Sequence, residues 1–394
     1  MIRIGFLLNH DAAHQVLHCI PIAYELARRN PEISVVIIIT THEESEGVER
    51  IAANYPDVSC QIEIAKAPTY ATVFDKVTGH AMLAKRFGVL WHHRAWLGTF
   101  DALVVPDKTS LVLKRWLGEN CPFMINTGHG AGDRAGGFKG LERFDYHLLH
   151  GRKYAERMLA EGSVAPGCYT VIGYVKFDCL PAAPQAKLFS NDRPTVIYAP
   201  HFDPMVSSWF GWGESVLEYF ANSTEFNLIF APHVLLFRRR WHISLTGGLP
   251  RRTPSIPEFA RHAPNILVDP GSLASIDMTY LRAADIYMGD VSSLVNEFLI
   301  EPRPCLFLNR MGADWKGNEN FLFWETGDVL ESLDELPVAL KMAVSEPMRY
   351  RVQQEQVTRE AFDLTGTPSS IRAADAITSF LESQGKLPAS TAPV

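Results

Sequence analysis

The chain lacks several features that mark whole classes of protein. Its 394 residues include no run of the ~18 uncharged apolar residues needed to cross a bilayer, and the apolar start at residues 2–8 is too short for a signal-peptide core. Its six cysteines are scattered without a C-x-x-C pair, which fits a reducing compartment better than a disulfide framework. We therefore expect a cytoplasmic protein, and peripheral contact with the cytoplasmic membrane stays open.

Charge and motif absences narrow the function. The chain has 37 Lys and Arg against 44 Asp and Glu, without the clustered basic excess of a protein that binds duplex nucleic acid, so we expect no nucleic-acid partner. Neither a P-loop nor a D-x-D sequence occurs, and His92 and His93 have no spaced partners for a metal site. We expect no cofactor and no metal.

What is present is an alternation of short apolar runs and helical patterns, typical of parallel βαβ units. In the first half, the expected strands are residues 2–8, 34–40, 101–106, 122–126, 146–149 and 169–172, with helices at 15–29, 43–54, 111–117 and 152–161. In the second half, the expected strands are 195–199, 226–231, 265–268, 285–288 and 304–308, with helices near 214–222 and at 273–283, 293–301, 333–344, 348–362 and 369–384.

A Pro- and Ala-rich stretch at residues 180–194 separates the two series. The sequence thus predicts an α/β protein with two Rossmann-like, doubly wound domains facing a cleft, residues 1–180 and 190–375, followed by a tail of disordered composition at 385–394. Ligands of such sheets bind beyond the carboxyl ends of the strands. Motifs on the loops after strands are therefore the candidate sites.

The loop after the strand at 122–126 is rich in glycine. Six of the fifteen residues from Asn126 to Gly140 are glycine, which lets the backbone approach a ligand closely. His129 lies between Gly128 and Gly130, and an imidazole with the ordinary pKa of about 6.5 accepts a proton near neutral pH. We interpret His129 as a general base; a surface loop with an incidental histidine is the alternative.

A second motif joins a strand to a helix. Asp290, Ser292 and Ser293 stand at the expected helix start, where free N–H groups and hydroxyls suit a phosphate. Glu297, one turn further on, is placed to reach a ribose hydroxyl. The alternative is ordinary helix capping by these side chains.

Several segments resemble the CDP-glycerol glycerophosphotransferase family. Residues 276–281, Asp290-Val291-Ser292-Ser293 and 303–308 are similar to the family's nucleotide-binding signature. Residues 126–130 resemble its Trp-His-Gly loop, 172–178 its Gly-x-Pro-Arg-x-Asp turn and 198–200 its Tyr-Ala-Pro-Thr strand end, and His233 resembles its second-domain histidine. The resemblance covers roughly residues 120 to 310, with its pieces in the family's order.

This resemblance implies a GT-B-type fold and a transferase of cell-envelope biosynthesis. Such an enzyme moves a polyol phosphate, for example glycerol phosphate, from a CDP-activated donor to a hydroxyl acceptor that is lipid- or glycan-linked, and releases CMP. The first domain would serve the acceptor and the second the nucleotide-linked donor. By similarity, His129 would deprotonate the acceptor hydroxyl, while His233, Ser292 and Ser293 would stabilise the diphosphate.

The sequence also departs from the family. Gly128 replaces the loop tryptophan, residues 131–134 replace Thr-Pro-Leu-Lys, and His201 and Asp203 stand where the family has Thr and Arg. Asp203 removes a candidate phosphate clamp, so either His201 and Arg134 replace it or the donor is not CDP-glycerol. The donor is therefore less well defined than the reaction class.

Two segments, residues 87–97 and 235–242, mix aromatic and basic side chains as interfacial membrane contacts do. Core packing is the alternative for Trp91 and Trp96, whereas Arg238, in the run 238–240, suits a lipid headgroup or the donor phosphates.

Two other functions stay open. A different GT-B enzyme, either a glycosyltransferase or a UDP-sugar 2-epimerase, would share the fold and bind a nucleotide at the same helix start. A non-catalytic nucleotide-binding or scaffold protein would account for the altered glycine loop and for Asp203.

Overall fold

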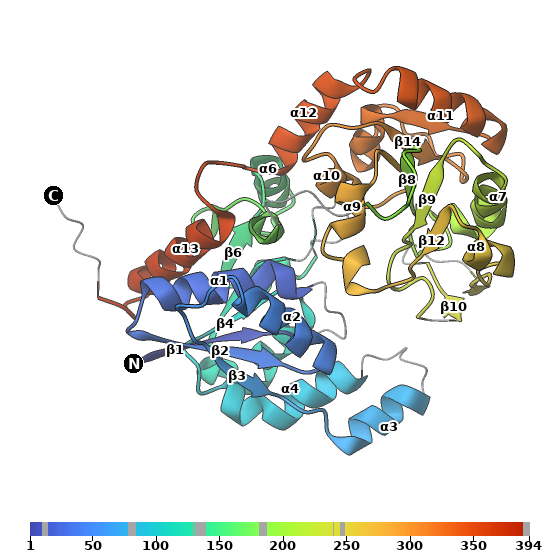
Figure 1. The fold of residues 1–394 in the computed structure, drawn as a ribbon. Helices are drawn as coiled ribbons and strands as arrows, with labels where there is room; N and C mark the ends of the chain where they lie inside the picture. Colours follow the sequence, from blue (N-terminus) through green and yellow to red (C-terminus); the bar gives the residue numbers. More distant parts are fainter. Residues whose placement is uncertain are drawn as a thin grey trace. The chain divides into compact units, whose positions relative to one another are not determined.

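The computed structural model describes residues 1–9, 15–77, 84–128, 130, 139–180, 187–238, 240–244 and 249–388. The chain forms two compact units, each built on its own parallel sheet (Figure 1). Unit 1 comprises residues 1–129, 136–180 and 360–394, and unit 2 comprises residues 130–135 and 181–359.

Unit 1 is built on a seven-stranded sheet in the order β3-β2-β1-β4-β5-β6-β7, with every neighbouring pair parallel. Its strands are β1 (Ile2–Leu7), β2 (Ile33–Ile39), β3 (Gln61–Ile64), β4 (Ala102–Val105), β5 (Phe123–Asn126), β6 (Tyr146–Leu149) and β7 (Tyr169–Val171). Its helices are α1 (Val16–Arg29), α2 (His42–Ala52), α3 (Thr69–Val77), α4 (Ala84–Leu97), α5 (Val112–Leu117), α6 (Arg152–Ala160) and α13 (Ser369–Ser383).

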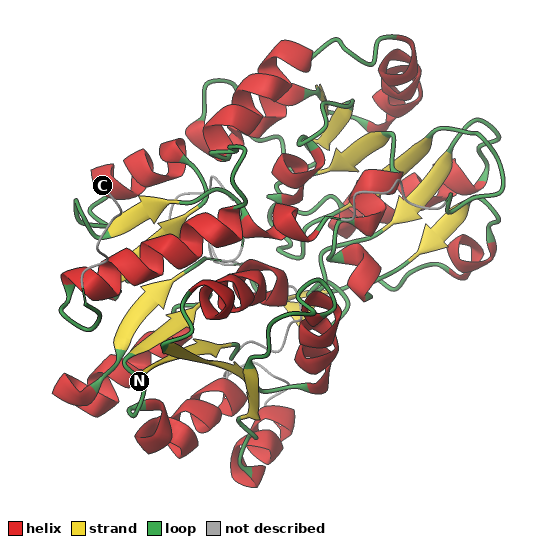
Figure 2. Cartoon of the chain, turned by 60° about the vertical axis from the view of Figure 1, so that its left-hand side comes forward, coloured by secondary structure: helices red, strands yellow, loops and turns green. Residues whose placement is uncertain are grey.

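Helices cover both faces of this sheet, as Figure 2 shows by its strands lying between helices. One face of β1 and β2 packs with α1, α2 and α13, through side chains such as Phe6, Ile37 and Ile377. The other face packs with α4, α5 and α6, through side chains such as Leu7 and Val89. Central strands buried on both faces read in the sequence as continuous apolar runs.

Unit 2 is built on a six-stranded parallel sheet in the order β12-β9-β8-β13-β14-β15. Its strands are β8 (Thr195–Ala199), β9 (Asn227–Phe230), β12 (Ile266–Val268), β13 (Ile286–Gly289), β14 (Cys305–Leu308) and β15 (Asp328–Leu330), with a separate antiparallel pair, β10 (Trp241–His242) and β11 (Arg251–Arg252). Its helices are α7 (Trp209–Ala221), α8 (Glu258–His262), α9 (Thr279–Ala283), α10 (Leu294–Phe298), α11 (Leu336–Ser345) and α12 (Arg351–Ala361), which ends at the boundary with unit 1.

The predicted fold class, an α/β chain with two Rossmann-like domains and C-terminal helices, is confirmed. The predicted extent of the second domain, to residue 375, differs from the observed units because α13 packs on α1 in the core of unit 1. The predicted disordered tail at 385–394 is wrong at its start, since Leu387 is buried in that same core. Residues 389–394 lie outside the described residues.

The expected helix at 273–283 is also wrong. A 3-10 turn at Leu273–Ser275 and the short α9 replace it, because Met278 adopts a left-handed φ of 69° that a continuous helix does not allow. The edge strands β3 and β15 were not predicted; β3 is largely exposed and therefore has no buried apolar run.

Candidate functional site

The candidate site lies at the carboxyl edge of the sheet of unit 2. Strands β9, β8 and β13 are neighbours, so the loops that follow them meet at one edge. His201 comes two residues after β8, His233 three residues after β9, and Asp290 directly after β13. Three segments that are far apart in the sequence thus contribute to one place.

The imidazoles of His201 and His233 form a pair, with ring centroids 5.3 Å apart. The backbone N–H of Asp203 donates to Nδ1 of His201 at 3.1 Å, and that of Leu235 donates to Nδ1 of His233 at 3.2 Å. A ring nitrogen that accepts a hydrogen bond carries no proton, so each neutral ring holds its proton on Nε2. Both rings are therefore held as Nε2–H donors.

Burial keeps His233 neutral. Burial, together with a smaller effect of the neighbouring His242, lowers the pKa of His233 to about 4. Phe202 lies against both rings of the pair, 4.4 Å from His201 and 4.7 Å from His233 between centroids. At neutral pH His233 can donate a hydrogen bond without carrying a charge, as preorganised oxyanion donors do.

Asp290 holds this edge together. Its fully buried carboxylate accepts hydrogen bonds from the N–H of His201 at 2.9 Å and from the N–H and Oγ of Ser208 at 2.7 and 2.9 Å. Burial raises the pKa of Asp290 to about 6, while the same hydrogen bonds act to lower it. The carboxylate thus fixes the loop after β8 through two backbone N–H groups and one hydroxyl.

The two serines differ in their surroundings. Ser292 is buried, and its Oγ accepts a hydrogen bond from the N–H of Leu294 at 3.3 Å. Ser293 is half-buried and makes no side-chain capping bond to α10. A Cβ built on Gly130 would lie 3.7 Å from Ser293 Oγ, so this end of the glycine loop belongs with unit 2. Glu297 is buried within α10.

Asp203 has a structural role in the turn after β8. It is 1% exposed and accepts hydrogen bonds from the N–H of Met205 at 2.9 Å and from Oγ of Ser244 at 3.0 Å. The carboxylate therefore closes the turn after β8, in the same loop that presents His201. Position 203 therefore supplies no positive charge to this edge of the sheet, and any such charge comes from other residues.

Arg310 was missed by sequence reasoning. It lies two residues after β14, and its guanidinium donates to the carbonyl oxygens of Ser207 at 2.9 Å and Pro204 at 3.1 Å. Burial lowers the pKa of Arg310, and the nearby Arg251 lowers it further, while Asp290 acts to raise it. An arginine just after a strand end is the signal that could have found it.

In unit 1, the glycine loop begins at the end of β5. Asn126 is buried and donates to the carbonyl of Val105 at 3.3 Å, and Gly128 has a φ of +64° with open space around its Cβ position. Glycine favours this left-handed conformation, which a tryptophan would rarely adopt. His129 and Arg134 lie outside the described residues, so their proposed roles stay predictions.

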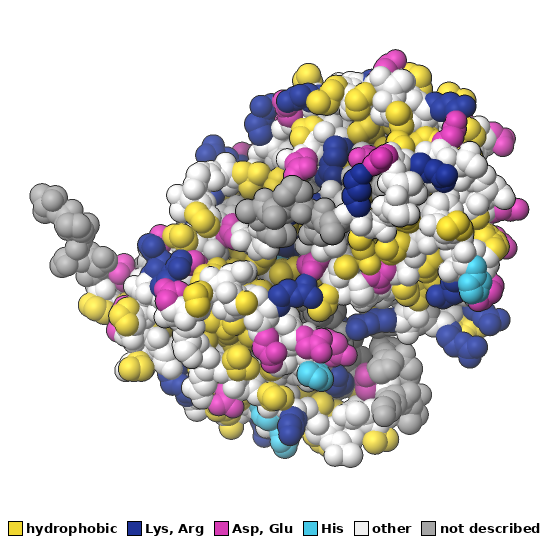
Figure 3. Space-filling model, viewed as in Figure 1, with side chains coloured by type: hydrophobic (Ala, Val, Ile, Leu, Met, Phe, Trp, Pro, Cys, Tyr) yellow, Lys and Arg dark blue, Asp and Glu magenta, His cyan; other side chains and the backbone are white. Residues whose placement is uncertain are grey.

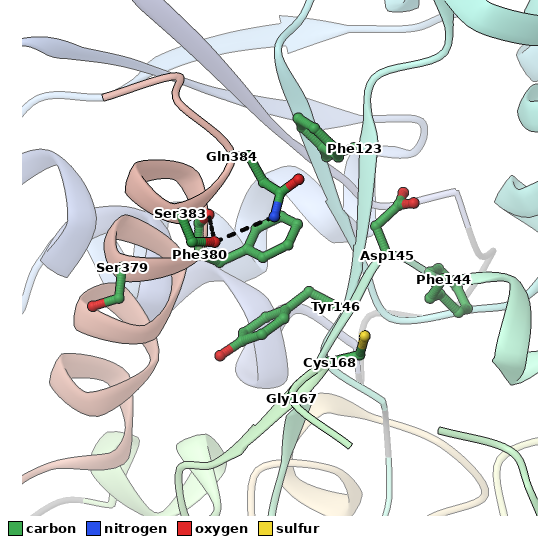
Figure 4. Close-up of a pocket in the computed structure, with 10 residues that line it drawn as sticks. All are labelled: Phe123, Phe144, Asp145, Tyr146, Gly167, Cys168, Ser379, Phe380, Ser383 and Gln384. Atoms are coloured by element: carbon green, nitrogen blue, oxygen red, sulfur yellow. Dashed lines mark hydrogen bonds between the residues drawn. The ribbon is translucent and has the colours of Figure 1, made fainter. Parts of the chain in front are cut away.

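A cavity of about 530 Å³ lies at the opposite, amino edge of the sheet of unit 1 (Figure 4). Its polar side chains are already engaged: Asp145 binds Lys114 at 2.7 Å, Tyr146 hydroxyl binds Thr170 at 2.6 Å, and Gln384 donates to Ser383 at 3.2 Å. The strands begin there rather than end. This cavity is not our candidate site.

Two further observations concern metals and membranes. Within the described ranges, no group of three or more His, Cys, Asp and Glu is arranged to hold a metal ion. Among the helices of the same described ranges, none is both long and apolar enough to span a bilayer.

Arg238 is exposed and lies just before β10.

No family model matches the sequence, and no curated protein is similar to it at the sequence level. Similar solved structures include the wall teichoic acid polymerase TagF, with a TM-score of 0.60 and 14% identity over 97% of this chain and 90% of that one. A UDP-N-acetylglucosamine 2-epimerase gives 0.57 and 12% over 100% and 98%, and the S. aureus MnaA–UDP complex gives 0.58 and 10% over 98% of both chains. At these identities the likeness concerns the fold: the chain has a GT-B-type fold of two Rossmann-like domains.

Proposed function

We propose that the protein is a GT-B-type transferase that moves a polyol phosphate from a CDP-activated donor to a hydroxyl acceptor. The observation that carries this proposal is the pair of imidazoles, His201 and His233, whose Nδ1 atoms are held by backbone N–H groups. The pair lies at the same sheet edge as the Ser292–Ser293 turn, because β9, β8 and β13 are neighbours. Hydrogen-bond donors paired in this way suit the oxygens of a diphosphate.

In the proposed reaction, the acceptor hydroxyl gives its proton to His129, and its oxygen attacks the phosphorus that carries the polyol. The bond between that phosphorus and the bridging oxygen breaks, and CMP leaves with the electron pair. Negative charge grows on the CMP phosphate, where His233, His201 and the Ser293 hydroxyl would donate hydrogen bonds. One such donor contributes about 10²- to 10³-fold in rate in other enzymes.

The positive charge for the donor would come from Arg310. Its guanidinium lies on the loop after β8 through its bonds to Ser207 and Pro204. Arg134, which we expected to replace the family's arginine, lies outside the described residues. Asp290 is then a positioning residue, since it holds the N–H of His201.

A second candidate is a UDP-sugar 2-epimerase or another nucleotide-sugar enzyme. The likeness to the UDP-N-acetylglucosamine 2-epimerase covers all of this chain, with a TM-score close to that for TagF. The Nε2–H pair would serve a UDP diphosphate as well as a CDP diphosphate. The two candidates differ in the base of the nucleotide and in the chemistry: the transfer breaks a phosphorus–oxygen bond and releases CMP, whereas 2-epimerisation inverts a carbon of the sugar and transfers no group to an acceptor.

The test is CMP release by the purified protein, given CDP-glycerol and a series of hydroxyl acceptors. We expect CMP to form with at least one acceptor and the rate to fall about 10²- to 10³-fold in His233→Ala. His262→Ala is the matched control, because His262 is exposed and lies on α8 away from the carboxyl edge.

Epimerisation of UDP-N-acetylglucosamine without CMP release from CDP-glycerol would favour the second candidate. A rate of CMP release that is unchanged in His233→Ala would contradict the role proposed for His233. The absence of both CMP release and epimerisation with the unmodified protein would contradict both enzymatic candidates and favour a non-catalytic nucleotide-binding or scaffold protein. His233→Gln, which keeps a hydrogen-bond donor, should retain more activity than His233→Ala.

A further inference from the structure

A short hairpin of unit 2 stands apart from its main sheet. Strands β10 and β11 pair only with each other, with Trp241 opposite Arg252 and His242 opposite Arg251. Figure 1 draws β10 at the periphery of this unit. The proposed function uses none of its exposed side chains.

The hairpin carries an unbalanced positive charge. Between Glu225 and Glu258 the sequence has five arginines and no acidic residue. Arg240, Arg251 and Arg252 are exposed, and no carboxylate among the described residues lies within ion-pair distance of them. Figure 3 shows basic side chains gathered in the region where Figure 1 labels β10.

The charge of the hairpin also affects the pKa of a neighbouring arginine in unit 2. Burial is the main cause of the lowered pKa of Arg310, and the like charge of Arg251 is the next. The positive charges of Arg251 and Arg310 repel each other, and an anionic partner would reduce this repulsion.

The same hairpin exposes large apolar side chains. Trp241 is 59% exposed, Ile243 is 63% exposed and Leu249 is 87% exposed. Trp241 and Ile243 alternate with the buried His242 and Ser244, so they point outward from one face of the strand. The inward face is already packed, and the outward face is apolar.

We propose that the β10–β11 hairpin docks the protein on an anionic bilayer surface. Arginines near such a surface are attracted to acidic headgroups, while tryptophan, isoleucine and leucine enter the boundary between headgroups and acyl chains. A soluble polyanion would use the arginines but would gain little from exposed Ile243 and Leu249. The combination of charge and apolar side chains therefore selects a membrane.

This inference does not rest on the proposed function, and its test uses no enzymatic readout. The full-length protein is sedimented with vesicles of phosphatidylcholine alone and with vesicles that also contain phosphatidylglycerol. We expect binding only to the anionic vesicles, and binding that weakens as salt screens the arginines.

Two double variants separate the two contributions. Arg251→Gln with Arg252→Gln should weaken partitioning about thirty-fold, which corresponds to ~1 kcal/mol for each arginine. Trp241→Ser with Leu249→Ser should weaken it about tenfold or more, because less apolar surface enters the interface.

Matched controls come from exposed residues elsewhere on unit 2. Arg193→Gln with Arg261→Gln removes the same charge, and Val338→Ser with Val352→Ser removes exposed apolar side chains on α11 and α12. Both controls should bind like the unmodified protein. Unchanged thermal midpoints will show that the hairpin variants remain folded.

Equal partitioning to both kinds of vesicle, or hairpin variants that bind like the unmodified protein, would overturn the proposal. So would tight binding to heparin that survives Trp241→Ser with Leu249→Ser, since the partner would then be a soluble polyanion. Loss of CMP release with vesicle binding intact would count against the proposed function alone.

Discussion

The carboxylate of Asp290 connects three backbone and side-chain donors in the interior of unit 2. Its removal in Asp290→Ala would leave the backbone N–H groups of His201 and Ser208 without their acceptor, while the Ser208 hydroxyl keeps only its bond to the Tyr198 hydroxyl at 2.9 Å. Leaving such groups unpaired in a buried place costs about 3 kcal/mol. We expect the urea midpoint of unit 2 to fall accordingly, as followed by tryptophan fluorescence.

The exposed Asp192 provides the control for this experiment, because Asp192→Ala removes a carboxylate from a place where solvent can replace it. Its effect on the urea midpoint should be much smaller than that of Asp290→Ala. Equal stability of the two variants would show that Asp290 does not hold the loop.

His150 makes the stability of unit 1 depend on pH. Burial lowers its pKa from 6.5 to about 4, although Nδ1 is bonded to the carbonyl of Ala361 at 2.8 Å. Between pH 6.5 and 4 the unfolded chain thus binds a proton that the folded chain does not. The stability that neutral His150 contributes is present above pH 6.5 and is lost as the pH falls towards 4.

We expect the free energy of unfolding to fall by up to ~1.4 kcal/mol per pH unit for each such histidine in this window. His147, whose pKa burial also lowers to about 4, adds to the slope. His150→Gln should flatten the slope measured by urea unfolding at several pH values, whereas His262→Gln should not. A slope that His150→Gln leaves unchanged would contradict the assignment.

At the scale of elements, the buried strands were the most predictable part of the chain. Strands β8, β9 and β13 are buried throughout, so each reads as an apolar run between turn residues. The packing partner of α13 could not be predicted, because its periodicity defines an apolar face but not the sheet that covers it. The interruption of the expected helix at Met278 could not be predicted either, because methionine generally favours helices.

Gly151, at the start of α6, lies against the backbone of the chain segment that returns to unit 1. A Cβ at this position would lie 2.1 Å from the carbonyl oxygen of Ala361, which is backbone and cannot move aside cheaply. Gly151→Ala should therefore destabilise unit 1 by about 3 kcal/mol.

The control lies on the same returning segment. A Cβ on Gly366 would meet nothing within 4 Å, so Gly366→Ala should be neutral or slightly stabilising. Thermal unfolding of both variants will compare them. A tolerated Gly151→Ala would mean that the contact with Ala361 is not maintained in solution.

At the scale of the molecule, the candidate site combines loops that only the sheet order brings together. The sequence predicted Ser292 and Ser293 from the expected helix start and His233 through a resemblance. It could not show that Asp203 and Asp290 bind the backbone, nor that Arg310 joins the loop after β8. Such contacts depend on β8 lying between β9 and β13, which local patterns do not reveal.

This arrangement predicts where a nucleotide should change the motions of the chain. The N–H groups of Asp203 and Leu235 are bonded to the two imidazoles, so a ligand held by the Nε2 atoms should also slow the opening of these bonds. Ligand binding lowers the open population by a factor of 1 + [L]/Kd. We expect CMP, more than UMP, to slow hydrogen exchange in residues 200–208, 231–237 and 290–297.

The sheet of unit 1 serves as the internal reference, since exchange in β1 and β2 should not respond to CMP. His233→Ala should abolish the protection, while His262→Ala should keep it. Protection confined to the strand ends of unit 1 would place the nucleotide on the wrong sheet for the proposed transfer. Stronger protection by UMP than by CMP would favour a UDP-linked substrate, because the diphosphate donors are common to both nucleotides and only the base differs.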